Sequence, residues 1–359
     1  MALLGIGNCA SALLQLIAAA RSSDTAVEIA APFPMIGPYG IGDIQPLLAI
    51  DIDRRKVGKS LAVAAFAPPN VPSSFIQLPR DFYDICVLMG QDLDNVQAKS
   101  SEFSVQPAVG PSVNLAELLW ERVDVLVNLL PTGRQRTTFA AAEACLRAKV
   151  ALVNAIPVPL AVDPAWARRF NEENIPLVGD DLKSQFGSTA LHVGLLELLL
   201  ARGVRVVRTI QTNWGGNADF FNLQDKEIFS AKRETKGRHL RALLGDSERV
   251  IINECQFVPE RGDLKRARIE IEGKVAYGRN LSLRVELEVE DSPNAATILV
   301  DAIRFVMRAG QKGKGGVLPE VSAYAMKSPP LVMNAQAIEP FLLELSGNDV
   351  PRSHSKGES

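Results

Sequence analysis

The sequence predicts an α/β protein whose first half is built on a parallel sheet, and three observations carry this prediction. Short apolar runs alternate with helix-like segments from the start to about residue 190. The first of these runs ends in a glycine turn, Gly5-Ile6-Gly7, directly before a helix-like segment. The pattern of apolar and polar residues changes near residue 190, and a helical pattern returns near residue 291. These changes predict a second part of the chain between those positions.

The elements of the first half follow from apolar runs and cap residues. Strands are predicted at residues 1–5, 46–52, 85–89, 123–130, 150–154 and 176–178. Helices are predicted at residues 9–21, 56–67, 115–121, 137–149 and 163–174, with polar helix and loop at 91–112. Asp163 suits the N-cap of the last helix, with Pro164 at its first position. Strands that are apolar throughout indicate a parallel sheet covered on both faces.

The second half has a different pattern. Helices are predicted at 191–202 and 223–244, with a strand at 204–212 between them. Residues 249–258, 267–276 and 281–289 alternate apolar and polar side chains, which indicates antiparallel strands. The helix at 295–309 begins a return segment. We expect one part at 1–190, a second at 191–290, a return of the chain to the first part at 291–345, and a disordered tail at 346–359.

Composition excludes several classes of protein. The formal charge of −2 provides no basic field for nucleic acid or an anionic membrane. No apolar run reaches the 18 or so residues of a spanning helix, and the N-terminus lacks the pattern of a signal peptide. The four cysteines are scattered, which favours reduced thiols in a cytoplasmic protein. Three histidines make a His-rich metal cage or a Ser/His/Asp enzyme a poor prediction.

The glycine turn predicts a dinucleotide site. Gly5 and Gly7 let the backbone approach a diphosphate, and Asn8, Cys9 and Ala10 open the helix whose N-terminus favours an anion. Ala10 or Ser11 replaces the third glycine of the usual motif. Asp51, with Asp53 second, is the acidic strand end expected to bind the adenosine ribose. The gap from Gly7 to Asp51 is about twice the usual spacing, so an irregular insertion at 31–42 must absorb it.

Polar segments in the second half predict a substrate site. Asp180, Asp181, Ser184 and Gln185 follow a strand end, where open α/β sheets bind ligands. A glycine-rich turn at 213–219 contains Asn213, Asn217 and Asp219. Lys232 and Lys236 lie four apart on one helix face, where like charges are mildly destabilising unless an anion lies between them. Lys327 follows in the return segment. Any one lysine of this kind is usually a solvated charge.

Taken together, these segments resemble the short bacterial and archaeal form of the myo-inositol-1-phosphate synthase family. The matching segments are GIGNCAS (5–11), DID (51–53), VNAIPV (153–158), DPAWARRF (163–170), VGDDLKSQ (178–185), GGNADFFNL (215–223), DSPNAA (291–296) and AYAMKSPP (323–330). They occur in order over about nine-tenths of the chain, and the resemblance is weak at 64–120 and 233–262. It implies a Rossmann-type NAD domain interrupted by an α+β domain for catalysis and tetramer formation.

The resemblance also implies a reaction. Members of the family cyclise glucose 6-phosphate to 1L-myo-inositol 1-phosphate without net redox change. The sugar is oxidised at carbon 5 by NAD, enolised, joined from carbon 6 to carbon 1, and reduced again. Ammonium groups stabilise the oxyanions of such steps, and a lysine whose pKa falls among other cations can also carry a proton. A hexose 6-phosphate is therefore the expected substrate.

Site residues follow from the motifs and the resemblance. The expected catalytic residues are Lys232, Lys236, Lys265, Lys327 and Asp181. The expected substrate-binding residues are Ser184, Gln185, Thr189, Asn213, Asn217 and Asp219. The expected cofactor-binding residues are Gly5, Gly7, Asn8, Cys9, Ala10, Asp51, Asp180, Asp291 and Ser292. Lys327 and Lys232 are assigned to the carbonyl oxygens and proton transfer, and Lys236 and Lys265 to the phosphate. Some family members bind a cation near Asp291, but the sequence identifies no metal ligands.

Three other readings stay open. The flanks of Lys236 and Lys265 depart from the family, so a paralog could cyclise fructose 6-phosphate to a five-membered cyclitol phosphate of carbocyclic nucleoside biosynthesis. An ordinary NAD-dependent dehydrogenase would instead change the absorbance at 340 nm. A sensor or scaffold that kept the fold would bind NAD without turning over a sugar phosphate.

Overall fold

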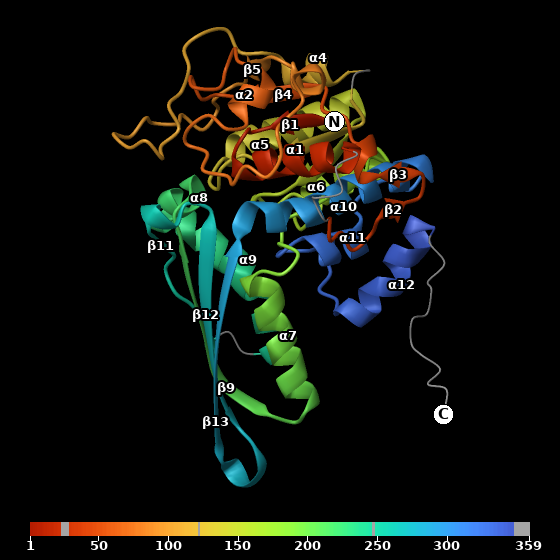
Figure 1. Ribbon diagram of the computed structural model, residues 1–359. Coiled ribbons are helices and arrows are strands. Elements are labelled where there is room, and N and C mark those ends of the chain that lie inside the picture. The colour runs from red at the N-terminus through yellow and green to blue at the C-terminus, as the bar shows by residue number, and fades with distance from the viewer. Residues whose placement is uncertain (23–28, 121–122, 246–247, 348–359) are drawn as a thin grey trace.

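The computed structural model describes residues 1–22, 29–120, 123–245 and 248–347, and folds them around two large sheets (Figure 1). In Figure 1 the first sheet lies at the top among its helices, and the long strands of the second extend below it. A small hairpin of β2 (Met35–Ile36) and β3 (Tyr39–Gly40) accounts for part of the predicted insertion at 31–42.

The first sheet has six strands, all paired in parallel, in the order β5-β4-β1-β6-β7-β8. These are β1 (Ala2–Leu4), β4 (Leu48–Asp51), β5 (Val87–Met89), β6 (Val125–Asn128), β7 (Ala151–Asn154) and β8 (Leu177–Val178). Numbered along the chain, this is the 3-2-1-4-5-6 order of a Rossmann sheet. The predicted fold class is therefore confirmed, and the order reverses between β1 and β6, where such sheets bind ligands.

Helices cover both faces of this sheet because strand side chains alternate between the faces. Leu3 and Val127 belong to the core on one face, and Ala2 and Leu126 to the core on the other. The first core includes α1 (Asn8–Arg21), α2 (Leu61–Ala64), α3 (Arg80–Tyr83), α10 (Asp291–Gln311), α11 (Pro319–Ala325) and α12 (Ala335–Ser346). The second includes α4 (Leu115–Leu119), α5 (Gln135–Ala148) and α6 (Pro164–Glu172). Long-range packing of α10 on α1 thus joins residues 291–311 to the first sheet.

The second sheet has the order β10-β9-β12-β13, with β11 also paired to β9. Its strands are β9 (Arg205–Gly215), β10 (Val250–Ile252), β11 (Gln256–Phe257), β12 (Leu264–Lys274) and β13 (Asn280–Glu290). The associated helices are α7 (Ser188–Ala201), α8 (Ala218–Asn222) and α9 (Lys226–Leu244). Leu196 of α7 and Leu240 of α9 pack on Ile269 and Ile271 of β12, which forms a separate apolar core.

One predicted strand direction is wrong. Residues 249–258 were expected to pair antiparallel, but β10 and β11 both run parallel to β9. Alternation of side chains reports which face is buried and not the direction of the strand. The chain returns from β9 to β10 through α8 and α9, and a helical crossover of this kind restores the original direction. β12 and β13 are antiparallel, as predicted.

Three further predictions need adjustment. The helix expected at 56–67 is reduced to α2, and within the described residues 91–112 form turns and loops without helix. Ser346 was placed in a disordered tail, but it ends α12 and is buried. Residues 348–359 of that predicted tail lie outside the described residues. None of the described helices is both long and apolar enough to cross a membrane.

Candidate active site

One large cleft lies where the carboxyl ends of the first sheet meet α9, β12 and the start of α10. It is lined by residues from the first sheet, from the second part of the chain and from the return segment. Fifteen of the predicted site residues line it: Gly5, Gly7, Asn8, Cys9, Asp51, Asp181, Ser184, Asn217, Asp219, Lys232, Lys236, Lys265, Asp291, Ser292 and Lys327. Residues far apart in the sequence therefore share one cavity.

The glycine turn forms one end of this cleft. Gly5 has φ +92°, and a Cβ there would lie 2.8 Å from the carbonyl oxygen of Leu129. A side chain would be excluded on both counts, so the turn requires glycine. Gly7 is the N-cap of α1, and within the described residues no side chain caps this helix. The backbone N–H groups of its first turn are thus left for an anion such as a diphosphate.

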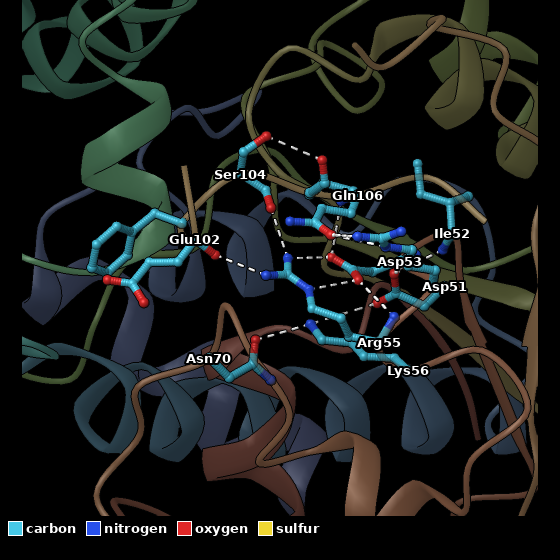
Figure 2. A network of polar contacts seen from close by, with 12 residues as sticks. Asp51, Ile52, Asp53, Arg55, Lys56, Asn70, Glu102, Ser104 and Gln106 are labelled. Carbon is cyan, nitrogen blue, oxygen red and sulfur yellow. Dashed lines mark hydrogen bonds and ion pairs between the residues drawn. The ribbon is translucent and has the colours of Figure 1, made fainter. Parts of the chain in front are cut away.

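The acidic strand end lies beside this turn, because Asp51 accepts the N–H of Ile6. Figure 2 shows Asp51 with Asp53 and their polar neighbours. Asp51 Oδ2 accepts the N–H of Ile6 at 2.7 Å, and its Oδ1 accepts those of Ile52 and Asp53 at 2.7 and 2.8 Å. These contacts fix the carboxylate at the cleft wall, where it can accept hydroxyl groups of a ribose. Asp53 is the weaker candidate because Arg55 occupies both of its oxygens.

Lys56 is a buried site residue that the sequence did not reveal. Its Nζ donates to the Ile6 carbonyl oxygen at 2.6 Å and to Asn70 Oδ1 at 2.9 Å, and lies 4.0 Å from Asp51 (Figure 2). Burial lowers the pKa of Lys56, while Asp51 and Asp53 oppose that effect. The peptide groups on both sides of Ile6 are thus held, one at its N–H by Asp51 and the other at its oxygen by Lys56, so the glycine turn is preorganised.

A cluster of lysines around Asp181 forms the other end of the cleft. Asp181 Oδ1 accepts from Lys232 at 2.9 Å and from Lys327 at 3.2 Å, and its Oδ2 accepts from Thr235 at 2.5 Å. Burial raises the pKa of Asp181, but the two ammonium groups outweigh it and hold the pKa below its usual range. Asp181 is fully buried, and its hydrogen bonds fix the ammonium groups of Lys232 and Lys327 next to each other. Asp181 also lines the cleft, and its place among the catalytic residues stays a prediction.

The two lysines of this cluster differ in acidity. Burial lowers the pKa of Lys327 to about 8, since the nearby Lys232, Lys265 and Lys236 add to burial and Asp181 opposes it. Burial also lowers the pKa of Lys232, but Asp181 and Asp219 outweigh it and raise the pKa above its usual value. Lys232 therefore stays protonated at neutral pH, while Lys327 can gain and lose a proton near pH 8.

Two more lysines complete the cationic side of the cleft. Lys265 on β12 pairs with Asp291 at the start of α10, with Nζ and Oδ1 2.9 Å apart. Burial lowers the pKa of Lys265, but Asp291 outweighs it, so the net shift is upward. Lys236 contacts Cys255 Sγ at 3.5 Å. A thiol is a weak hydrogen-bond partner, so the ammonium of Lys236 can bind a phosphate.

Asp263 joins the two ends of the cleft, and the sequence did not identify it as a site residue. Its Oδ1 accepts from Asn8 at 3.3 Å, Asn217 at 3.1 Å and Ser292 Oγ at 2.8 Å. Its Oδ2 accepts from the backbone N–H of Ser292 at 2.9 Å. Burial and the nearby Asp291 raise the pKa of Asp263 to about 6. The only signal in the sequence was its position two residues before Lys265.

Some predicted site residues lie elsewhere among the described residues. Asp180 is not a cofactor ligand in this geometry, because its buried carboxylate accepts from Asn154 and from the backbone of residues 160–162. Gln185 turns away from the cleft and donates to the Ala30 carbonyl oxygen. Thr189 is buried in α7, outside the cleft lining. Ala10 is buried at the start of α1, where its small size allows close packing.

Asn213 also lies outside the lining, and its role stays a prediction. It is fully buried on β9, and its Oδ1 accepts from Gln211. Its Nδ2 has no hydrogen-bond partner among the described residues.

The described residues contain no group of three His, Cys, Asp or Glu side chains that could hold a metal ion, so metal ligation gains no support from them.

Comparison with known proteins decides the family. A curated inositol-3-phosphate synthase of Mycolicibacterium smegmatis is 36% identical over 339 residues, which is 92% of this chain and 93% of that protein. The chain belongs to the myo-inositol-1-phosphate synthase family. An inositol-3-phosphate synthase of Corynebacterium glutamicum is likewise 36% identical, covering 96% of this chain and 98% of its own length.

Two other comparisons agree with the myo-inositol-1-phosphate synthase family. The model of the family, described as myo-inositol-1-phosphate synthase, matches residues 187–292, which contain Lys232, Lys236 and Lys265. The crystal structure of a protein called Ari2 superposes with a TM-score of 0.76 at 31% identity, covering 96% of this chain and 97% of its own. The resemblance seen in the sequence motifs is therefore confirmed.

Proposed function

We propose that this protein is an NAD-dependent cyclase that converts glucose 6-phosphate to 1L-myo-inositol 1-phosphate. The observation that carries this proposal is the convergence of four lysines on the cleft that begins at the glycine turn. A redox-neutral aldol cyclisation passes through oxyanions at several carbons, and each is stabilised by cations already in place. One of the alternatives, a simple dehydrogenase, needs no cluster of this size.

The glycine turn, the first turn of α1 and Asp51 fit NAD. Gly5 and Gly7 would face the diphosphate, and the carboxylate of Asp51 would accept ribose hydroxyls and repel a 2′-phosphate. When bound, NAD supplies the acceptance and return of a hydride at carbon 5 of the sugar. The remaining steps depend on side chains of this chain.

Lys327 is placed to move the proton of the carbon 5 hydroxyl. Its Nζ donates to Asp181 at 3.2 Å and to the Leu182 carbonyl oxygen at 2.5 Å. A neutral amine that makes both of these hydrogen bonds directs its lone pair away from them. We infer that this lone pair faces the cleft, where the neutral form would accept the hydroxyl proton as the alkoxide forms.

Lys232 and the phosphate-binding lysines act as fixed cations. Protonated Lys232 would stabilise the carbon 5 oxygen of the enolate that forms once a carbon 6 proton is lost. The proton lost from carbon 6 would pass to the phosphate dianion of the substrate, and a proton would pass from there to the carbon 1 oxygen as carbon 6 bonds to the carbon 1 aldehyde. Lys327 would return the hydroxyl proton to the carbon 5 oxygen when the hydride returns to carbon 5. Lys236, Lys265 and Ser184 would hold the phosphate. The proposal requires no metal near Asp291, because Lys265 already pairs with that carboxylate.

The proposal extends to organisation of the chain. We propose that 1–190 and 291–345 form the NAD domain, 191–290 form the catalytic domain, and the protein is a cytoplasmic homotetramer. Support for assembly comes from family membership and from exposed leucines on α7, with Leu198 60% and Leu200 37% exposed. Light scattering on the purified protein would test the tetramer, and a monomer would contradict it.

Phosphorus and carbon NMR on the purified protein tests the function. The protein is incubated with NAD and either glucose 6-phosphate or isomerase-free fructose 6-phosphate. A six-membered cyclitol phosphate from glucose 6-phosphate is the expected product, without a change in absorbance at 340 nm. A product from fructose 6-phosphate alone would establish the five-membered cyclitol synthase instead. Net formation of NADH would indicate a dehydrogenase, and NAD binding without any product would indicate a sensor.

A further inference from the structure

A long segment without helix or strand runs along the cleft between β5 and α4. It spans residues 90–114, and Val105 within it lines the cleft. Loops of more than about 12–15 residues without secondary structure are uncommon in compact domains and are usually functional. We refer to residues 99–107 of this segment as the strap. Its contacts at two sites indicate what it does.

The first site ties the strap to the strand end that carries Asp51 (Figure 2). Arg55 donates to the carbonyl oxygens of Glu102 and Ser104 at 2.8 and 2.7 Å. The same guanidinium is held by Asp53 through Nε at 2.9 Å and Nη2 at 2.6 Å. Asp53 also accepts the backbone N–H of Gln106 at 3.2 Å and is only 1% exposed. A bidentate pair whose carboxylate is buried is a rigid anchor.

The second site ties the strap to the other part of the chain. The Phe103 ring contacts both Phe257 of β11 and Phe221 of α8, with its centroid 5.0 and 6.2 Å from theirs. The Lys99 ammonium lies 5.9 Å from the centroid of the Phe221 ring. β11 belongs to the second sheet, whereas Arg55 follows β4 of the first sheet. The strap therefore bridges two parts of the chain that both contribute to the cleft.

The wall between these two anchors is part of the cleft itself. Val105, which lies between Phe103 and Gln106 in the strap, lines the cavity. Phe220 and Asn222, on either side of Phe221 in the sequence, line the same cavity. We propose that the strap is a built-in clamp across the nucleotide end of the cleft, and that Arg55 and Phe103 are positioning residues for NAD. A wall that is already ordered lowers the entropy cost of binding. This inference rests on the proposed function, since it assumes that the cleft holds NAD.

Calorimetric titration of the full-length apoprotein with NAD tests the clamp. Phe103→Ala removes the aromatic anchor, and Arg55→Lys keeps the charge but loses the bidentate geometry. Each variant should raise the Kd for NAD by about tenfold, while kcat at saturating NAD stays within about threefold of the original. Val109→Ala is the matched control, because Val109 is fully exposed just beyond the strap and should leave the Kd unchanged.

A double variant separates the clamp from a general loss of structure. If Phe103 acts through Phe257, then Phe103→Ala and Phe257→Ala should have non-additive effects on the Kd. Trypsin cleavage after Lys99 of the unaltered protein gives a second measurement that needs no variant. NAD should slow this cleavage several-fold, and a rate that NAD does not change would overturn the clamp.

The remaining outcomes are also decisive. Folded Phe103→Ala and Arg55→Lys proteins that bind NAD as tightly as the original would refute the role of the strap and leave the proposed function intact. An unaltered protein that binds no NAD would overturn the proposed cofactor, and the role of the strap with it.

Discussion

Replacement of Asp181 by asparagine should shift the pH dependence of catalysis. Asp181 Oδ1 lies 3.2 Å from Lys327 Nζ, which corresponds to an attraction on the order of 5 kcal/mol at an effective dielectric constant of about 20. This figure is an upper limit, because Lys232 shares the same oxygen. One unit of pKa corresponds to about 1.4 kcal/mol. Loss of the carboxylate charge should therefore lower the pKa of Lys327, by at most about three to four units.

The sign follows from the role given to Lys327. Its pKa of about 8 in the folded protein means that the neutral form, which accepts the substrate proton, increases as the pH rises through 8. The pH dependence of kcat/KM reports the ionisable groups of the free enzyme. We therefore expect kcat/KM to rise with pH, along a limb whose inflection lies near pH 8. In Asp181→Asn this limb should move to lower pH, although the maximal rate falls because Lys232 and Lys327 lose their shared partner.

The assay measures kcat/KM for glucose 6-phosphate by phosphorus NMR from about pH 6 to about pH 9, a range that includes the limb. Asp163→Asn is the control, since Asp163 caps α6 away from the cleft and asparagine caps equally well. An active Asp181→Asn protein whose limb stays at the original pH would refute the pairing of Asp181 with Lys327 as the determinant of proton transfer.

Three further substitutions test the rest of the site. Lys232→Met should lower kcat by about 100- to 1000-fold, because it removes one fixed cation, while calorimetry shows NAD binding retained; activity within a few-fold of the original would contradict this role. Asp51→Asn should weaken NAD binding and reduce the preference for NAD over NADP in the same titration, and an unaltered preference would contradict the ribose contact. Asp180→Asn should lower the free energy of unfolding by about 1–3 kcal/mol, because the amide keeps one acceptor oxygen but replaces the other with an NH2 group that faces N–H donors. NAD affinity should not change in Asp180→Asn, and a selective loss of affinity would restore Asp180 as a cofactor ligand.

The fold could be predicted from the sequence where the signal is local. Buried parallel strands such as β6 are short apolar runs, and Asp163 caps α6 as its sequence context indicates. The direction of β10 could not be predicted, because it depends on the crossover through α8 and α9. Alternating side chains identify the buried face of a strand and leave its partner open.

The site could be predicted only in part for the same physical reason. Motifs and family resemblance identified the lysines, but no local pattern places Lys265 of β12 against Asp291 of α10. Lys56 follows two arginines and has the local sequence of a solvated charge, yet it is buried against the glycine turn. Asp263 acts through partners that are 29 to 255 residues away in the sequence. Contacts over such separations are set by the fold as a whole.

The different acidity of Lys232 and Lys327 follows from the carboxylates around them. Both lysines are largely but not fully buried, and both donate to the same oxygen of Asp181. Burial lowers the pKa of each, but Lys232 also faces Asp219, with Nζ and Oδ2 3.9 Å apart. Lys327 has Asp181 as its counter-ion and three lysines as neighbours. One carboxylate thus supports a permanent cation and a proton carrier side by side, and a second carboxylate decides which lysine takes which role. Environments that separate the pKa values of paired groups in this way are typical of acid–base catalysis.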